Sequence, residues 1–161
     1  MTEDAAITED LRNLLDMEIG PEVYEIEKGM IRRFVLAIDD PSPLWQDEEY
    51  AGKSRYGGII APPTFVLTVG FDELQQHVLE SIPYGGILHG STELECYQPV
   101  RPGDAVTVTT KIADIRERQG SRMGKTVFVT LDITYKNQRQ ELIARCRQVF
   151  IGYRIEEAKY D

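Results

Sequence analysis

Side chains that could transfer protons or bind metal ions are scarce in this chain. It has two histidines, His77 and His89, and two cysteines, Cys96 and Cys146, which form no CxxC pair. This set cannot supply a histidine-rich zinc site, so we expect no metal. The sequence also lacks a GxxxxGK phosphate loop, a GxGxxG loop and a GxSxG nucleophile elbow. Any chemistry would therefore depend on carboxylates and a histidine acting as general acid or base.

One carboxylate stands out by its surroundings. Asp40 is followed by Pro41 and Pro43, which stop the preceding helix, and it begins a long polar connection that extends to Gly58. Long ordered loops in compact domains often carry function, so Asp40 is a candidate catalytic residue. An aspartate before two prolines can equally cap a turn, and the sequence leaves both interpretations open.

His89 is the second candidate catalytic residue. It stands between Leu88 and Gly90, next to a predicted strand, and it is the histidine that a proton-transfer mechanism could use. A structural hydrogen bond is the alternative role. His77 falls among polar residues in a predicted helix, so we expect it to face solvent.

The composition predicts one domain that avoids nucleic acid. A chain of 161 residues with 42% hydrophobic side chains can form a single core. Its formal net charge of −9 repels polyanions. No apolar run is long enough to cross a membrane, and the acidic N-terminus lacks a secretory pattern. We expect a cytoplasmic protein without a membrane partner, whose cysteines behave as small buried apolar residues.

The N-terminal segment has helical spacing. Its apolar residues predict a helix over 8–17, which Gly20 and Pro21 end. We expect residues 1–20 to form a helical arm beside one domain over 21–161.

One strongly apolar helical pattern and several strand patterns follow. The helix is predicted to start near Pro62 and to continue through 65–82, with Gly70 packed closely against a flat surface. In the last strand the apolar phase changes at Val149, which predicts a bulge. A further helix start is expected at 47–49 and a hairpin tip at 120–124. The other predicted elements are a strand over 23–27, a helix over 31–38, and strands over 87–97, 105–118, 127–135 and 142–151.

These elements predict an α+β fold. An antiparallel sheet of at least four strands has an apolar face that must be covered, and the long helix before most of the strands is the available cover. We therefore predict a single hot-dog domain, in which a long antiparallel sheet wraps around a central helix.

Three motifs carry a family resemblance, which covers roughly residues 23–151. In this order and spacing, the chain resembles the MaoC-like (R)-specific enoyl-thioester hydratases and 3-hydroxyacyl-thioester dehydratases. It is most similar to their MaoC N-terminal-like branch, also described as the FAS1-like dehydratase domain. The motifs are Asp40-x-x-Pro43-Leu44-x-x-Asp47, the segment from Gly57 to Phe65, and Leu88-His89-Gly90 followed by Tyr97 to Asp104.

The resemblance implies a reaction and a substrate. In the family, an aspartate and a histidine hold one water that adds across the double bond of an enoyl thioester, and the same pair removes it. An N–H at the start of the central helix binds the thioester oxygen. The substrate would be a thioester of coenzyme A or acyl carrier protein, with no other cofactor. Trp45, Ile60, Pro63 and Thr64 would then bind substrate. The basic residues Arg116, Arg118, Arg122 and Lys125 would be a solvated hairpin tip or would meet coenzyme A phosphates.

The chain departs from the family motifs at the groups that do the chemistry. Trp45 stands where the family has its histidine, and an indole cannot accept a proton. Ser42 replaces the loop asparagine. Where active members have His-Gly at the helix start, this chain has Pro62-Pro63, and proline has no N–H to donate. Thr64 could replace that donor.

Three hypotheses follow from these departures. The chain could be one subunit of a heteromeric hydratase or dehydratase, whose partner carries intact motifs. It could be a self-sufficient homo-oligomeric hydratase that uses Asp40 with His89. It could also be an acyl-CoA-binding module without turnover. All three include an acyl thioester and a homodimer or heterodimer of hot-dog domains.

Overall fold

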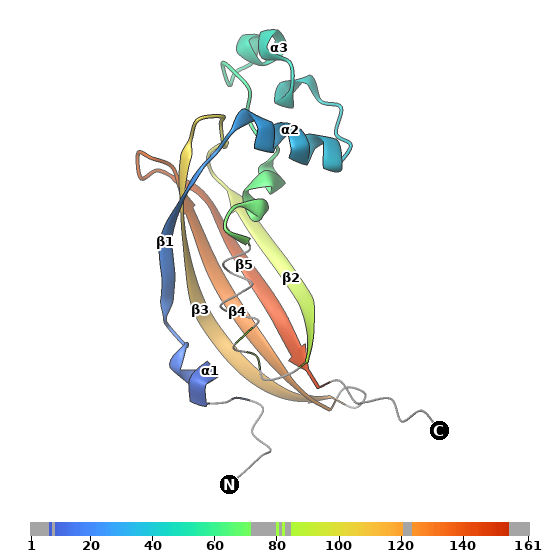
Figure 1. Ribbon diagram of the computed structural model, residues 1–161, viewed down its shortest axis with the longest axis vertical. Coiled ribbons are helices and arrows are strands. Elements are labelled where there is room, and N and C mark those ends of the chain that lie inside the picture. Colours follow the sequence, from blue (N-terminus) through green and yellow to red (C-terminus); the bar gives the residue numbers. More distant parts are fainter. Residues whose placement is uncertain are drawn as a thin grey trace, which may run out of the picture.

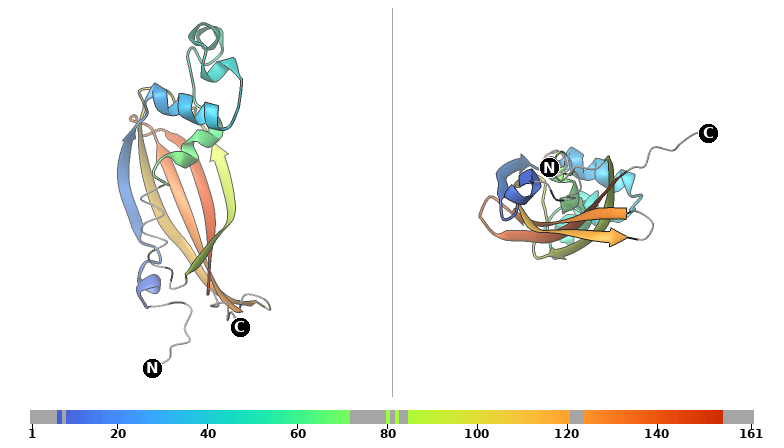
Figure 2. Two further views of the ribbon diagram at one scale, coloured as in Figure 1. Left: turned by 45° about the vertical axis from the view of Figure 1, so that its right-hand side comes forward. Right: turned by 90° about the horizontal axis from the view of Figure 1, so that it is seen from below.

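A strongly curved antiparallel sheet dominates the molecule. The computed structural model describes residues 7, 9–71, 80, 82, 85–120 and 124–154. Its five strands lie in the order β1-β3-β4-β5-β2, so β1 and β2 are the edges. The sheet curves around the turn η2, which lies on its concave side (Figures 1 and 2). The strands are β1 (Glu18–Glu25), β2 (Gly86–Cys96), β3 (Ala105–Gly120), β4 (Gly124–Lys136) and β5 (Leu142–Tyr153).

Short helices lie at both ends of this sheet. Two of them, α2 and α3, lie above the end where η2 begins, and α1 lies near the other end (Figure 1). Among the described residues, no helix is long and apolar enough to cross a membrane. The helical elements are α1 (Glu9–Asn13), α2 (Lys28–Ala37), η1 (Pro43–Trp45), α3 (Glu48–Lys53) and η2 (Pro63–Thr68).

The core lies between the concave face and η2. Strand β4 alternates buried and half-buried residues, as its sequence predicts, because successive side chains point to opposite faces of a sheet. Phe65 of η2 is 1% exposed and meets Phe34 of α2 edge-on, with ring centroids 5.5 Å apart. The buried β4 residues are Val127, Val129, Leu131, Ile133 and Tyr135.

The N-terminal helix is shorter than the sequence predicts. It ends at Asn13, because the chain joins the sheet soon afterwards: Asp16 N–H donates to Ile112 O at 2.9 Å. The predicted helix stop at Gly20 and Pro21 is instead part of β1, which already begins at Glu18. An edge strand tolerates this pair at a register shift between Ile19 and Glu22.

Gly20 shows why only glycine suits that shift. Its φ is +98°, and a Cβ at this position would lie 2.8 Å from the carbonyl oxygen of Val108. Other residues would meet both backbone strain and a clash with β3. The predicted strand over 23–27 is thus the second half of a longer strand.

The helix start predicted at the end of the Asp40 loop is confirmed. Asp47 caps α3 by accepting from Tyr50 N–H at 2.9 Å, which confirms the helix start expected at 47–49. Helix α2 covers the predicted stretch and begins three residues earlier, at Lys28.

The predicted central helix is described only in part. It begins at Pro63, as expected, but as the 3-10 turn η2, which ends at Thr68. Gly70 follows with φ +75°, and a Cβ there would lie 3.3 Å from the Tyr24 ring, which confirms the close packing predicted for this glycine. Residues 72–79, with His77, lie outside the described residues, as do residues 121–123 of the predicted hairpin tip.

The bulge predicted at Val149 of β5 is wrong, although β5 does have an extra residue at Ile143, where its register with β4 shifts. Burial alternates without a break through Cys146, Gln148 and Phe150, while Val149 stays half-buried on the other face. The prediction failed because the polar residue Gln148 lies on the buried face of β5, where it is only 5% exposed. The irregularity near Val149 lies opposite, in β2, where the register shifts between His89 and Ser91.

Candidate active-site groove

The Asp40 loop is held together by its own hydrogen bonds. The indole Nε1–H of Trp45 donates to Asp40 Oδ2 at 2.9 Å, and the backbone N–H of Ser42 donates to Asp40 Oδ1 at 3.0 Å. Ser42 also caps η1, with Leu44 N–H 3.4 Å from its Oγ. Both carboxylate oxygens of Asp40 therefore accept hydrogen bonds from within the loop.

This geometry gives Trp45 a role that the sequence did not reveal. A histidine at this position could exchange a proton with a neighbouring group, whereas the indole N–H can only donate. The aspartate and the residue five positions later are in contact, but the contact fixes the loop. Asp40 therefore caps a turn, as one of the two sequence interpretations proposed.

A groove of about 340 Å³ lies beside this loop. The Trp45 side chain forms part of its wall, together with η2 and the facing ends of β2 and β5. Among its described lining residues, Arg55 alone is charged, and the Arg55 guanidinium lies 4.8 Å from the centroid of the Tyr56 ring. The lining residues are Trp45, Arg55, Tyr56, Ile60, Ala61, Pro62, Pro63, Val66, Cys96, Tyr97, Gln98, Pro99, Val100, Ile143 and Ala144.

The start of η2 offers few backbone donors to this groove. Pro62 and Pro63 have no N–H. Ala61 N–H donates to Val100 O at 2.8 Å, and Phe65 N–H donates to Pro62 O at 2.9 Å. Thr64 is exposed and is not among the described lining residues. The position that would bind a thioester oxygen in the family is thus poor in donors.

Three of the four predicted substrate-binding residues meet in the groove. Trp45, Ile60 and Pro63 all line it, and Thr64 lies beside it on η2. Two further lining residues, Arg55 and Cys96, were not predicted. Arg55 lies two residues before the Gly57–Phe65 segment that carries the resemblance, which was an available signal. Cys96 gave no signal, because only the pairing of β2 with β5 brings it to η2, where its Sγ lies 4.0 Å from Pro63 O.

The structure does not bring His89 to Asp40 within one chain. His89 lies seven residues before Cys96 on β2, about 20 Å away along an extended strand. It is exposed, its Nε2 lies 2.8 Å from Thr92 Oγ1, and its ring meets Phe150 edge-on with centroids 5.5 Å apart. The contacts with Thr92 and Phe150 fit the alternative role for His89, a structural hydrogen bond.

The basic cluster at the β3–β4 hairpin also lies far from the groove. Thr126 near the tip pairs with Tyr153 at the end of β5, whereas the groove uses the beginning of that strand. The described cations of the cluster have local partners: Arg116 pairs with Asp114 at 2.6 Å, and the Arg118 guanidinium lies 5.0 Å from the centroid of the Phe128 ring. This favours the solvated hairpin tip.

The two cysteines differ in environment. Cys146 is buried, and desolvation raises the pKa of its thiol to about 11. Cys96 is exposed at the groove, and partial burial also raises the pKa of its thiol. The expectation that both are buried is therefore wrong for Cys96, because its strand is at the sheet edge. Among the residues described, no three His, Cys, Asp or Glu side chains gather as a metal site would require.

The curved sheet around η2, with a groove at one end, defines a hot-dog domain. The "FAS1-like, dehydratase domain region" family matches residues 13–146, so the chain belongs to this family. This agrees with the resemblance to MaoC-like hydratases and dehydratases.

Relatives and solved structures support the same placement. The chain is 37% identical over 101 residues to a UPF0336 protein of Streptomyces avermitilis, covering 61% of this chain and 67% of that one. It is 26% identical to a probable enoyl-CoA hydratase alpha subunit of Thermomonospora curvata, covering 91% of this chain and 53% of that protein. The fold matches the HadBC (3R-hydroxyacyl-ACP dehydratase) complex of Mycobacterium tuberculosis with a TM-score of 0.73 and 23% identity, over 86% of this chain and 97% of that one.

Proposed function

We propose that this chain is the acyl-thioester-binding subunit of an (R)-specific enoyl-thioester hydratase or 3-hydroxyacyl-thioester dehydratase. A partner hot-dog subunit would supply the groups that transfer protons. The hydrogen bond from Trp45 to Asp40 carries this proposal, because it uses the aspartate of the family motif to hold the loop.

The proton-transfer machinery is incomplete in the isolated chain. Activation of water needs a group that accepts a proton within hydrogen-bond reach. Trp45 cannot accept one, and Asp40 is engaged by Trp45 and Ser42. The donors that would stabilise an oxyanion are also missing at Pro62 and Pro63.

The groove suits the apolar part of an acyl thioester. Its volume of about 340 Å³ is at the lower end of the range for small-molecule sites. Trp45, Ile60 and Pro63 offer apolar walls, and Arg55 offers a cation to a phosphate or carboxylate of the carrier. No cofactor besides the coenzyme A or acyl-carrier thioester is required by this arrangement.

A partner subunit is supported by the free edge of the sheet and by the relatives. In the described part of the sheet, β2 pairs with β5 on one side, and its other side is unpaired. The Thermomonospora curvata relative is called an alpha subunit, and the Mycobacterium tuberculosis neighbour is a complex. A strand from another hot-dog domain could extend the sheet at β2.

Hydration of crotonyl-CoA and longer enoyl-CoA thioesters tests the proposal. The chain should be assayed alone and as the complex recovered with it, through an affinity tag, from the cells that make it. We expect hydration by the complex and none by the chain alone. Trp45→Ala in the complex should raise KM more than it lowers kcat, because the ring would contact substrate without transferring a proton.

Two other outcomes would identify the alternatives. Robust hydration by the chain alone would refute the proposal and would support the self-sufficient hydratase, which then requires Asp40 and His89 from two copies. Binding of enoyl-CoA without turnover, even in the complex, would refute it in favour of an acyl-CoA-binding module.

A further inference from the structure

A ladder of alternating charge crosses the convex face of the sheet. In the strand register, Glu18 of β1 faces Lys111 of β3, which faces Asp132 of β4. Asp132 faces Arg147 of β5, which faces Glu93 of the edge strand β2. Each charge thus has the opposite sign on its neighbouring strand, and the ladder ends in a carboxylate at the β2 edge.

One inner step of this ladder, between Asp132 and Arg147, is a direct contact. Arg147 donates twice to Asp132, at 2.7 and 2.8 Å, and this hydrogen bonding holds the pKa of Asp132 below its ordinary value. Hydrogen bonding to Asp16, with weaker attraction from Glu18 and Asp132, raises the pKa of Lys111. Because the Arg147 fork is engaged by Asp132, Glu93 receives only a longer-range attraction from it.

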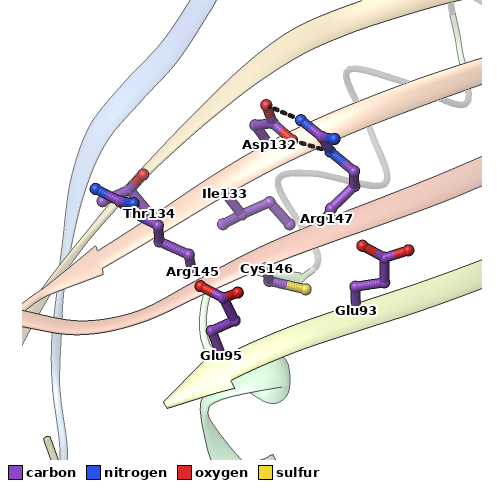
Figure 3. Close-up of a pocket in the computed structure, with 8 residues that line it drawn as sticks. All are labelled: Glu93, Glu95, Asp132, Ile133, Thr134, Arg145, Cys146 and Arg147. Carbon is purple, nitrogen blue, oxygen red and sulfur yellow. Dashed lines mark hydrogen bonds and ion pairs between the residues drawn. The ribbon is translucent and has the colours of Figure 1, made fainter. Parts of the chain in front are cut away.

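Glu95 repeats the acidic end one step along the edge. It faces Arg145 in the register and accepts a hydrogen bond from Tyr97 OH at 2.5 Å. Figure 3 shows Glu93 and Glu95 on β2 at one side of a hollow, with Arg147 and Asp132 at the other. The hollow measures about 420 Å³, which leaves room beside both carboxylates for incoming side chains.

We propose that Glu93 and Glu95 select the partner that pairs with β2, by accepting Lys or Arg side chains from the edge strand of a different hot-dog subunit. A basic side chain opposite each carboxylate continues the alternation of the ladder by one strand. This inference rests on the proposed heteromeric function and names the chemistry of the partner's edge.

A second copy of the chain would pair poorly with the half of β2 that carries Glu93 and Glu95. Residues opposite one another in an antiparallel pair lie on the same face, about 5 Å apart, and diagonal neighbours are still within reach. A copy that pairs through the same half of β2 brings its own Glu93 and Glu95 against these two. The net charge of −9 adds to the repulsion between copies. The two glutamates thus act against a homodimer as well as for a heteromer.

Charge reversal at Glu93 and Glu95 tests this selection of partners. The experiment needs neither the natural partner nor an activity assay. The variant Glu93→Lys/Glu95→Lys should be mixed with the wild-type chain, and the mass distribution measured by sedimentation at low salt. We expect mixed dimers with a Kd at least about tenfold lower than that of either chain alone. Added salt should narrow this difference, because exposed charges are screened.

The matched control reverses two exposed glutamates at the opposite edge, Glu22→Lys/Glu25→Lys on β1. Mixing this variant with the wild type should not strengthen association. The inference is overturned if the wild-type chain alone dimerises as tightly as the Glu93→Lys/Glu95→Lys mixture, if that mixture stays monomeric, or if the control mixture pairs equally well. Hydration activity of the chain alone would refute the proposed function and leave this measurement unaffected.

Discussion

The two ends of the sheet hold the two residues that the sequence marks for chemistry, and they hold them differently. At the groove end, Asp40 lies in a half-buried loop whose hydrogen bonds occupy both of its carboxylate oxygens. At the other end, His89 lies on an exposed edge strand, with Thr92 and Phe150 as its contacts. One end forms an ordered groove beside a carboxylate that is already hydrogen-bonded, and the other carries an exposed imidazole.

Under the proposed function, this difference separates substrate binding from the reaction. The groove needs walls, a fixed loop and an open mouth, which Trp45, η2 and the end of β2 provide. The reaction needs an acid–base pair in one place. A single chain separates its two candidate residues by about two-thirds of strand β2, and the proposed function assigns the missing group to a second subunit.

The largest expected effect concerns Phe65, which supports the groove end. Phe65→Ala removes a fully buried ring and its contact with Phe34, and should cost about 3–5 kcal/mol of unfolding free energy. Phe150→Ala, beneath His89, is the matched change at the other end. Urea unfolding should show a large loss for both, but only Phe65→Ala should also speed the alkylation of Cys96. If Phe150→Ala speeds the alkylation of Cys96 equally, the two ends of the sheet unfold as one unit and the contrast between them is wrong.

A smaller effect is expected where the loop is held by Asp40. An asparagine keeps one acceptor oxygen, so Asp40→Asn leaves either the Trp45 or the Ser42 N–H without its partner. We expect a loss of about 1–2 kcal/mol in unfolding free energy. His89→Ala, which removes an exposed contact, should stay within about 0.5 kcal/mol. If both variants lose equal stability, the contrast between the two ends is wrong.

The smallest effect is protection of Cys96 by a ligand in the groove. Saturating butyryl-CoA, an unreactive thioester, should slow alkylation of Cys96 by iodoacetamide several-fold, because this thiol lines the groove. Cys146 is the internal control: it is buried with a pKa of about 11, so it should react slowly with or without ligand. Peptide mass spectrometry after timed quenching separates the two thiols. Unchanged labelling of Cys96 at saturation would place the thioester elsewhere.

Much of the fold could be predicted from the sequence, because strand alternation is a local property. The strands β3 and β4 were placed correctly by their period of two. The errors arose where tertiary contacts override local signals. Gly20 and Pro21 read as a helix stop, yet pairing with β3 makes them part of an edge strand. The polar residue Gln148 interrupts the apolar pattern of β5, yet it is buried on the same face as Cys146 and Phe150.

The residues that line the groove could be predicted from the sequence better than the hydrogen bonds and distances that decide its chemistry. The motif spacing located Trp45, Ile60 and Pro63 around one groove. It could not show that the Trp45 indole donates to Asp40, since that depends on the rotamers of a loop. Nor could it separate Asp40 from His89, because their distance is set by the length and direction of β2, which joins residues far apart in the sequence.

The register shift in β2 also affects how readily the chain would aggregate through its sheet edge. A long, flat, unpaired edge strand is a template for uncontrolled assembly into fibrils. Strand β2 has 11 residues, but the shift between His89 and Ser91 leaves a regular run of only six, from Ser91 to Cys96. Glu93 and Glu95 fall inside that run as charged gatekeepers. The short regular run and its two charges thereby protect the unpaired edge of β2 against aggregation.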